Sequence, residues 1–266
     1  METKEMDTIQ TTKTRPMPFW MSLIFFGVPA AIIGTGFYLG IPLLARIGIP
    51  FFWSYNFFMG FPAIMMFVAV FIACRLEGNP LTWEGIRSRL RLKPIKGKEW
   101  LWTAGLFLVF GAGPFVLGFA NRWLASTHLF TPPDFLPALL DPRANIASGL
   151  GNDFWGVPLR GNWWVFGVEL IVIFFNIFGE ELWWRGYVLP RQELAQGKRA
   201  WVVHGILWLL FHVHQRWNWI GMLPGALMTP FVASKLKNTS PAIIAHWANN
   251  GLLLVVIILG ILGVTS

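Results

Sequence analysis

Ionisable and amide side chains lie inside a strongly apolar stretch of the chain, where a helix would separate them onto two faces. Successive residues of a helix are about 100° apart, so Glu169, Asn176 and Glu180 fall on one face. Glu181 points about 100° away from Glu180 and shares its face with Arg185 at i+4, a spacing that suits an ion pair. We therefore predict that Glu180 faces the inside of a helix bundle and that Arg185 neutralises Glu181. A carboxylate in such a place can transfer protons in acid–base catalysis.

Two later apolar stretches carry histidines. His204, Trp208 and His212 share one helix face at four-residue spacing, and His246 and Asn250 share another. An ionisable residue inside a membrane span costs about 2.5–3.5 kcal/mol. One intramembrane histidine or asparagine is often only a helix–helix hydrogen bond. Because a carboxylate, two imidazoles and an amide recur on three helices at similar predicted depth, we interpret them as one site.

Composition indicates which solvent surrounds these helices. Of the 266 residues, 55% are hydrophobic and only 13% are charged, whereas soluble domains carry about 25% charged residues. Seven apolar stretches qualify as candidate spans when about 20 residues are needed per crossing. They cover approximately residues 19–45, 50–74, 101–120, 163–184, 201–214, 219–236 and 241–264. The expected fold is all-α, a polytopic membrane helix bundle with about seven transmembrane helices.

The distribution of basic residues predicts the orientation of the bundle. With a cytoplasmic amino terminus, sixteen Lys and Arg residues fall in inside segments and five in outside segments, which obeys the positive-inside rule. The net charge of +8 is therefore interpreted as loop cations at a membrane face, and a nucleic-acid partner is not expected. We expect a multi-pass protein of the cell membrane. The sequence implies no particular oligomeric state.

The chain is predicted to consist of a short tail and one membrane domain. Residues 1–18 form the predicted disordered cytoplasmic tail, and residues 19–266 the single membrane domain. The first apolar run is longer than the roughly 7–15 residues of a cleavable signal core, so it should remain a membrane helix. The basic loop 75–99 contains a predicted short helix, residues 81–92, with Thr82 as N-cap. This helix would anchor the loop on anionic lipid.

Three motifs follow one another along the carboxyl-terminal half. The segment 180–185 matches an EExxxR motif, and the segment 246–250 fits HxxxN. His212, four residues after Trp208, resembles an FxxxH motif in which tryptophan replaces the usual phenylalanine. In this order and this apolar setting, the motifs resemble those of the CPBP family. That family includes the CAAX prenyl endopeptidases of the Rce type and the bacterial proteins often called Abi. The resemblance covers about residues 163–254.

The resemblance implies an intramembrane endopeptidase of glutamic type. Such an enzyme would act on peptide or membrane-protein substrates, CAAX-like tails among them, without a metal or another cofactor. Glu180 and His212 would activate the attacking water, and His246 with Asn250 would stabilise the oxyanion. Imidazole and amide donors aimed at one point suit a tetrahedral intermediate. The arginine of EExxxR would hold the second glutamate of that motif and so position the end of its helix.

Three other functions remain open on the sequence. Glu180, His212 and His246 could bind a catalytic zinc ion, because two His and one Glu form a known zinc set, although the sequence has no HExxH motif. The protein could instead be a non-catalytic membrane partner, immunity factor or regulator, because fold does not determine function. A transporter is the third alternative, since buried Glu and His can relay protons. The chain shows no repeated halves with broken helices, which argues against that reading.

Overall fold

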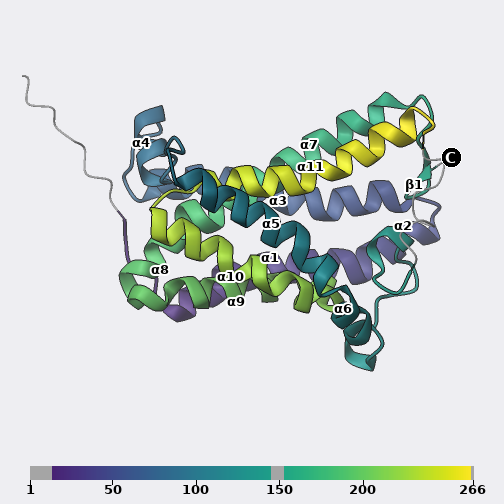
Figure 1. Cartoon of the computed structure of the whole chain (residues 1–266), viewed down its shortest axis with the longest axis horizontal. Coiled ribbons are helices and arrows are strands. Elements are labelled where there is room, and N and C mark those ends of the chain that lie inside the picture. The colour runs from purple at the N-terminus through teal and green to yellow at the C-terminus, as the bar shows by residue number, and fades with distance from the viewer. Residues whose placement is uncertain (1–13, 145–152, 265–266) are drawn as a thin grey trace, which may run out of the picture.

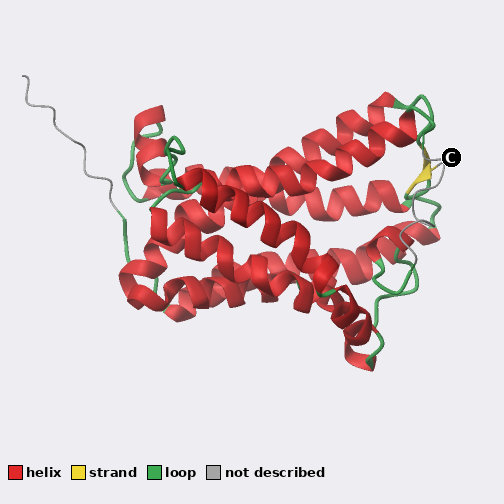
Figure 2. Ribbon diagram, in the orientation of Figure 1, coloured by secondary structure: helices red, strands yellow, loops and turns green. Residues whose placement is uncertain are grey.

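The computed structural model describes residues 14–144 and 153–264, and within these ranges the chain is almost entirely helical. The long helices lie alongside one another, and loops and short elements gather at the two ends of the bundle (Figure 1, Figure 2). The predicted all-α membrane bundle is confirmed. Of the tail predicted for residues 1–18, residues 1–13 lie outside the described part.

The amino-terminal half contains three long helical segments. The first runs through α1 (Phe19–Thr35), the π-helical η1 (Gly36–Gly40) and α2 (Ile41–Arg46). The second and third are α3 (Phe51–Leu76) and α5 (Glu99–Val116), separated by the short α4 (Trp83–Arg89). After them come α6 (Gly118–Ala125), two 3-10 turns (His128–Phe130 and Ala138–Leu140) and the antiparallel strands β1 (Asp153–Phe154) and β2 (Val157–Pro158).

The carboxyl-terminal half contains the three motifs. Its elements are α7 (Trp163–Glu180), the π-helical η5 (Glu181–Val188), α8 (Leu189–Gln196), the 3-10 turns η6 (Gly197–Arg199) and η7 (Val213–Asn218), α9 (Ala200–Phe211), α10 (Trp219–Leu236) and α11 (Ser240–Ile261). The α-helix expected over residues 163–184 therefore changes to π-helix directly after Glu180. The helix expected over residues 201–214 ends one residue before His212.

Four helical segments among the described residues are long and apolar enough to cross a membrane, namely Phe19–Arg46, Phe51–Leu76, Glu99–Val116 and Ser240–Ile261. Large apolar side chains on these segments are exposed, as expected of surfaces that face lipid; Phe57 and Ile72 are examples. The chain is an integral membrane protein. The other three predicted spans coincide with α7 and η5, with α9 and with α10, and the count of seven crossings stays a prediction.

Contacts between the long helices form a closed ring. Helix α7 packs between α3 and α11, and α10 packs between α9 and α5. Contacts of α5 with α11, and of α1 with both α3 and α9, complete the ring. The motif-bearing segments therefore belong to one enclosed bundle. A side chain at Gly179 would collide with the carbonyl oxygen of Ala63 on α3, so this glycine allows the close helix approach that places Glu180, the next residue.

The short helix in the basic loop packs against the π-helix. Thr82 accepts a hydrogen bond from the Gly85 backbone N–H at 3.2 Å, which confirms the predicted N-cap. The helix is shorter than the predicted 81–92, because it ends at Arg89 and Arg91 has a positive φ. Arg89 of α4 is buried, donates to Glu77 at 2.8 Å and reaches the carbonyl oxygen of Gly186 in η5 at 3.3 Å. At least one arginine of this loop therefore holds the protein together and is not available to lipid.

Candidate active site

Glu180 is held by two neutral donors from two helices. It is the last residue of α7 and only 4% exposed. Asn176, one turn earlier, donates to its Oε1 at 2.9 Å, and the indole N–H of Trp208 on α9 donates to its Oε2 at 3.0 Å. Among the described residues no cation forms a salt bridge with Glu180. Each carboxylate oxygen therefore keeps lone-pair capacity for a further proton donor.

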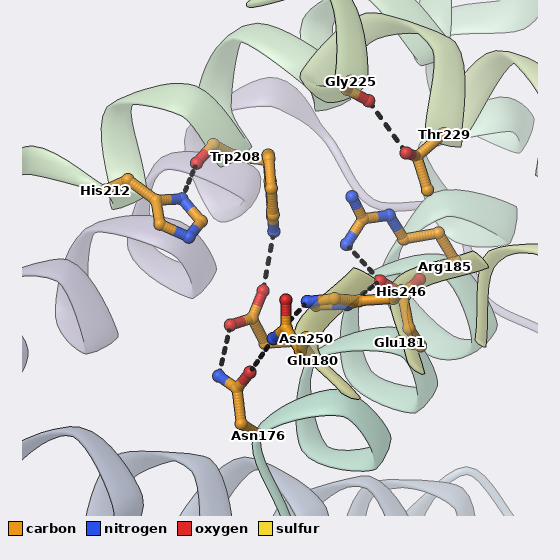
Figure 3. Close-up of polar contacts among 10 residues, drawn as sticks. All are labelled: Asn176, Glu180, Glu181, Arg185, Trp208, His212, Gly225, Thr229, His246 and Asn250. Atoms are coloured by element: carbon orange, nitrogen blue, oxygen red, sulfur yellow. Dashed lines mark hydrogen bonds and ion pairs between the residues drawn. The ribbon is translucent and has the colours of Figure 1, made fainter. Parts of the chain in front are cut away.

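His212 is oriented by the same tryptophan. Its Nδ1 lies 2.9 Å from the carbonyl oxygen of Trp208, and the two rings lie 4.3 Å apart, centre to centre. Because a carbonyl oxygen can only accept, Nδ1 is assigned the hydrogen and the neutral ring has an unprotonated Nε2. Figure 3 shows Trp208 between Glu180 and His212, joined to one through its indole and to the other through its backbone.

Glu181 bridges Arg185 and His246. Its Oε1 lies 3.2 Å from Nη1 of Arg185, the ion pair that the i+4 spacing predicted, and 2.9 Å from Nδ1 of His246. Both members of the ion pair are fully buried. The guanidinium of Arg185 also lies over the ring of Trp208, at 4.7 Å from its centre, so a cation–π contact connects this pair to the residue that holds Glu180.

Asn250 connects the two halves of the cluster. Its Nδ2 donates to Oδ1 of Asn176 at 3.1 Å and lies 3.2 Å from Nε2 of His246. The Phe110 ring stacks on the imidazole of His246 at 5.7 Å. All six motif residues thus belong to one connected set of contacts, drawn from α7, η5, α11 and the residue directly after α9, His212, as Figure 3 shows.

Two polar residues that share faces with the motif residues lie outside this cluster. Nδ1 of His204 is 2.7 Å from Oε1 of Gln192, whose amide donates to Ser22 at 3.0 Å. Glu169 accepts a hydrogen bond of 2.6 Å from Asn56 of α3. Both are buried, and both serve helix–helix contacts. Equal spacing along a helix therefore did not predict a shared partner, because each turn faces a different neighbour.

Three features of the site were not evident from the sequence. The indole of Trp208 binds Glu180, a hydrogen bond that the usual phenylalanine of the motif has no donor to make. Glu181 contacts His246 as well as Arg185. Asn176 joins two motifs through opposite ends of its amide. The departure from FxxxH was the only signal for the first feature. Spacing indicated that Asn176 and Glu180 share a helix face, but it did not indicate the contact of Asn176 with Asn250 or that of Glu181 with His246.

Glu180, His212 and His246, the residues proposed for the zinc alternative, are not arranged as a metal site in the described part of the chain. Within the described ranges, no group of three or more His, Cys, Asp or Glu side chains is arranged to hold a metal ion. Both ring nitrogens of His246 are engaged, Nδ1 with Glu181 and Nε2 with Asn250. Zinc ligation by Glu180, His212 and His246 would require this cluster to rearrange.

The fold and the site together define a class of protein: an integral membrane helix bundle with a buried glutamate–histidine–asparagine cluster. Residues 162–252 match the family model described as Rce1-like, the type II CAAX prenyl endopeptidases. No curated protein and no solved structure matched the chain. The resemblance inferred from the three motifs is confirmed for this segment, which matches the Rce1-like model and contains every motif residue. At the level of the family, the match indicates a protease.

Proposed function

We propose that this protein is an intramembrane endopeptidase in which Glu180 and His212 activate a water molecule. The observation that carries the proposal is their common attachment to Trp208. The indole donates to Glu180 and the carbonyl oxygen accepts from Nδ1 of His212, so a carboxylate and an unprotonated Nε2 remain available as proton acceptors. The family match to type II CAAX prenyl endopeptidases supports peptide substrates at a membrane, with prenylated tails as the first class to test.

The proposed reaction is hydrolysis through a tetrahedral intermediate. A water molecule bound between Glu180 and Nε2 of His212 gives up a proton as its oxygen attacks the scissile carbonyl carbon. The proton passes to the amide nitrogen, the carbon–nitrogen bond breaks, and a carboxylic acid and an amine are the products. Burial of the cluster keeps bulk water away, so electrostatic interactions with the developing charge are strong.

His246 and Asn250 are proposed to stabilise the oxyanion. In the arrangement described, Nδ1 of His246 donates to Glu181 and Nε2 accepts from Asn250. To donate through Nε2 as well, His246 must carry hydrogens on both ring nitrogens, and the Glu181 carboxylate stabilises that cation. The Asn250 amide hydrogen that now meets Nε2 would turn toward the oxyanion. Glu181 is thus proposed as a positioning residue for His246.

The proposal is tested by cleavage assays on purified protein in liposomes. Substrates are a farnesylated CAAX peptide, the same peptide without the prenyl group, and a peptide library, with products identified by mass spectrometry. His212→Gln should lower kcat/KM about 10²–10⁴-fold, the usual cost of losing a general base. His204→Gln is the matched control, because His204 is a buried histidine of α9 outside the cluster. Wild-type activity in His212→Gln, or no cleavage of any peptide by the wild type, would contradict the proposal.

A further inference from the structure

A cationic cavity lies where α8, α9 and α10 meet, outside the polar cluster. Its volume is about 370 Å³. Its main lining residues are Lys198, Trp201, Phe231, Ser234, Lys235 and Lys237. These come from the start of α9, the end of α10 and the turns beside them, at the same end of the bundle as α4 and α8 (Figure 1). We call this cavity the lysine pocket.

Glu193, a carboxylate that lines the lysine pocket, is neutralised by cations. Glu193 lies 2.6 Å from Nζ of Lys237 and 2.8 Å from Nη2 of Arg91. Burial raises the pKa of Glu193, but hydrogen bonds from Arg91, Lys237 and Ser234 outweigh it and hold this pKa below its ordinary value. In the part of the chain that the structure describes, Lys198 and Lys235 have no acidic partner. The pocket therefore carries an excess of positive charge.

An apolar groove begins beside the lysine pocket and follows α5 and α10. It has a volume of about 430 Å³ and is lined mainly by Leu101, Trp102, Gly105, Val109, Met228 and Val232, together with Lys98. Trp102 of the groove and Phe231 of the pocket meet edge to face at 6.1 Å. Nζ of Lys235 lies over both rings, at 4.5 Å from the centre of Trp102 and 5.7 Å from that of Phe231. The two hollows are therefore neighbours across one aromatic pair.

The length of the groove fits one leaflet of a bilayer. From Lys98 to Val109 the helix rises about 16 Å at about 1.5 Å per residue. Half of a typical hydrocarbon core is about 15 Å. The cationic end lies beside the basic loop 75–99, where the headgroups of that leaflet would be found.

We propose that the lysine pocket and the groove together bind one anionic phospholipid. Its phosphate would lie against Lys198 and Lys235, and one acyl chain would fill the groove along α5. The excess positive charge selects an anionic headgroup over a zwitterionic one, and the apolar groove selects a lipid over a soluble phosphate.

The test uses purified full-length protein in zwitterionic micelles, titrated with phospholipids whose acyl chains carry bromine, a quencher of tryptophan fluorescence. Brominated phosphatidylglycerol should quench saturably and at lower concentration than brominated phosphatidylcholine. Each lysine near a headgroup contributes about fivefold in affinity, so the Lys198→Ala/Lys235→Ala double variant should bind phosphatidylglycerol about 25-fold more weakly. The matched control is Lys93→Ala/Lys96→Ala, which removes two exposed lysines of the basic loop outside the pocket.

A second variant tests the groove without altering charge. A Cβ at Gly105 would meet no atom within 4 Å, so Gly105→Leu should fill the groove without disturbing helix packing. It should weaken quenching at least tenfold. Gly27→Leu, which also places its Cβ in open space but on α1, is the control.

Several outcomes would overturn the proposal. They are equal quenching by the two lipids, equal effects of the two double-lysine variants, and unchanged binding in Gly105→Leu. A fourth arm adds soluble glycerol phosphate. If it displaced the brominated lipid at concentrations similar to those at which the lipid binds, the pocket would recognise a free phosphate and the lipid assignment would be wrong.

Discussion

The Glu180→Gln substitution removes the proposed proton acceptor at the centre of the cluster while nearly preserving the packing of the side chain. The substitution keeps the shape of the side chain but leaves one acceptor atom where there were two. In the wild type, Asn176 donates to one carboxylate oxygen at 2.9 Å and Trp208 donates to the other at 3.0 Å. With Gln, one of these donors faces an NH2 group. Asn176 cannot simply turn its amide, because its Oδ1 accepts from Asn250.

The expected cost to stability is smaller than the cost to activity. Losing one hydrogen bond to a charged acceptor costs about 1.5–3 kcal/mol. Removing a buried carboxylate that has no cationic partner offsets part of this cost. Loss of the general base should lower kcat/KM about 10²–10⁴-fold, which corresponds to about 2.7–5.4 kcal/mol of transition-state stabilisation. The variant should therefore fold and fail to cleave.

Glu169→Gln is the matched control for this experiment. Glu169 lies on the same helix, is 2% exposed, and likewise accepts a hydrogen bond from an asparagine amide, Asn56, at 2.6 Å. Cleavage rates in liposomes and melting temperatures would be measured on the same purified samples. Glu169→Gln should keep activity within about threefold of the wild type, because Glu169 makes a helix–helix contact and takes no part in the proposed reaction. If Glu180→Gln remained active, or if both variants lost activity equally, the assignment of Glu180 as the base would be refuted.

Three further predictions concern the rest of the site. Glu181→Gln should lower both the melting temperature and kcat, because it leaves Arg185 buried without a charge partner and removes the anion beside His246; a variant as stable and active as the wild type would contradict this. Trp208→Phe keeps the ring but removes the N–H that binds Glu180, so kcat should fall about 13–160-fold, the equivalent of about 1.5–3 kcal/mol, and unchanged kinetics would show that this hydrogen bond is unimportant. Treatment with a strong chelator should leave the cleavage rate unchanged, and a loss that zinc alone restores would favour the metalloprotease alternative.

Several properties followed from local sequence, because local geometry decides them. The low charge content predicted a helical membrane bundle. The i+4 spacing of Glu181 and Arg185 predicted their ion pair, which the structure places at 3.2 Å. Thr82 was identified as an N-cap, and its hydroxyl accepts from Gly85 as that role requires. The ion pair and the N-cap depend only on residues a few positions apart, whose distance a helix determines, and the membrane class depends only on composition.

Other properties were decided only when the helices packed. The hydrogen bond from Trp208 to Glu180 joins residues 28 positions apart, and that from His246 to Glu181 joins residues 65 apart. The four-residue spacing of His204, Trp208 and His212 suggested one shared face, yet His204 binds Gln192 and only His212 joins the cluster. The two histidines lie about two helical turns apart, and each turn faces a different neighbouring helix.

The change from α-helix to π-helix after Glu180 is the clearest case in which local sequence did not predict the type of helix. Nothing in the segment 181–188 marks it as π-helical, and its spacing was interpreted as that of an α-helix. In the folded protein, Arg89 of α4 reaches the carbonyl oxygens of Gly186 and Tyr187 within this segment. The wider π turn redirects the side chains that follow Glu180, and the contacts from Arg89 bind two carbonyl oxygens of this segment. Sequence spacing determines which residues share a helix face, whereas packing determines what that face meets, because contacts between helices depend on how all of them fill space together.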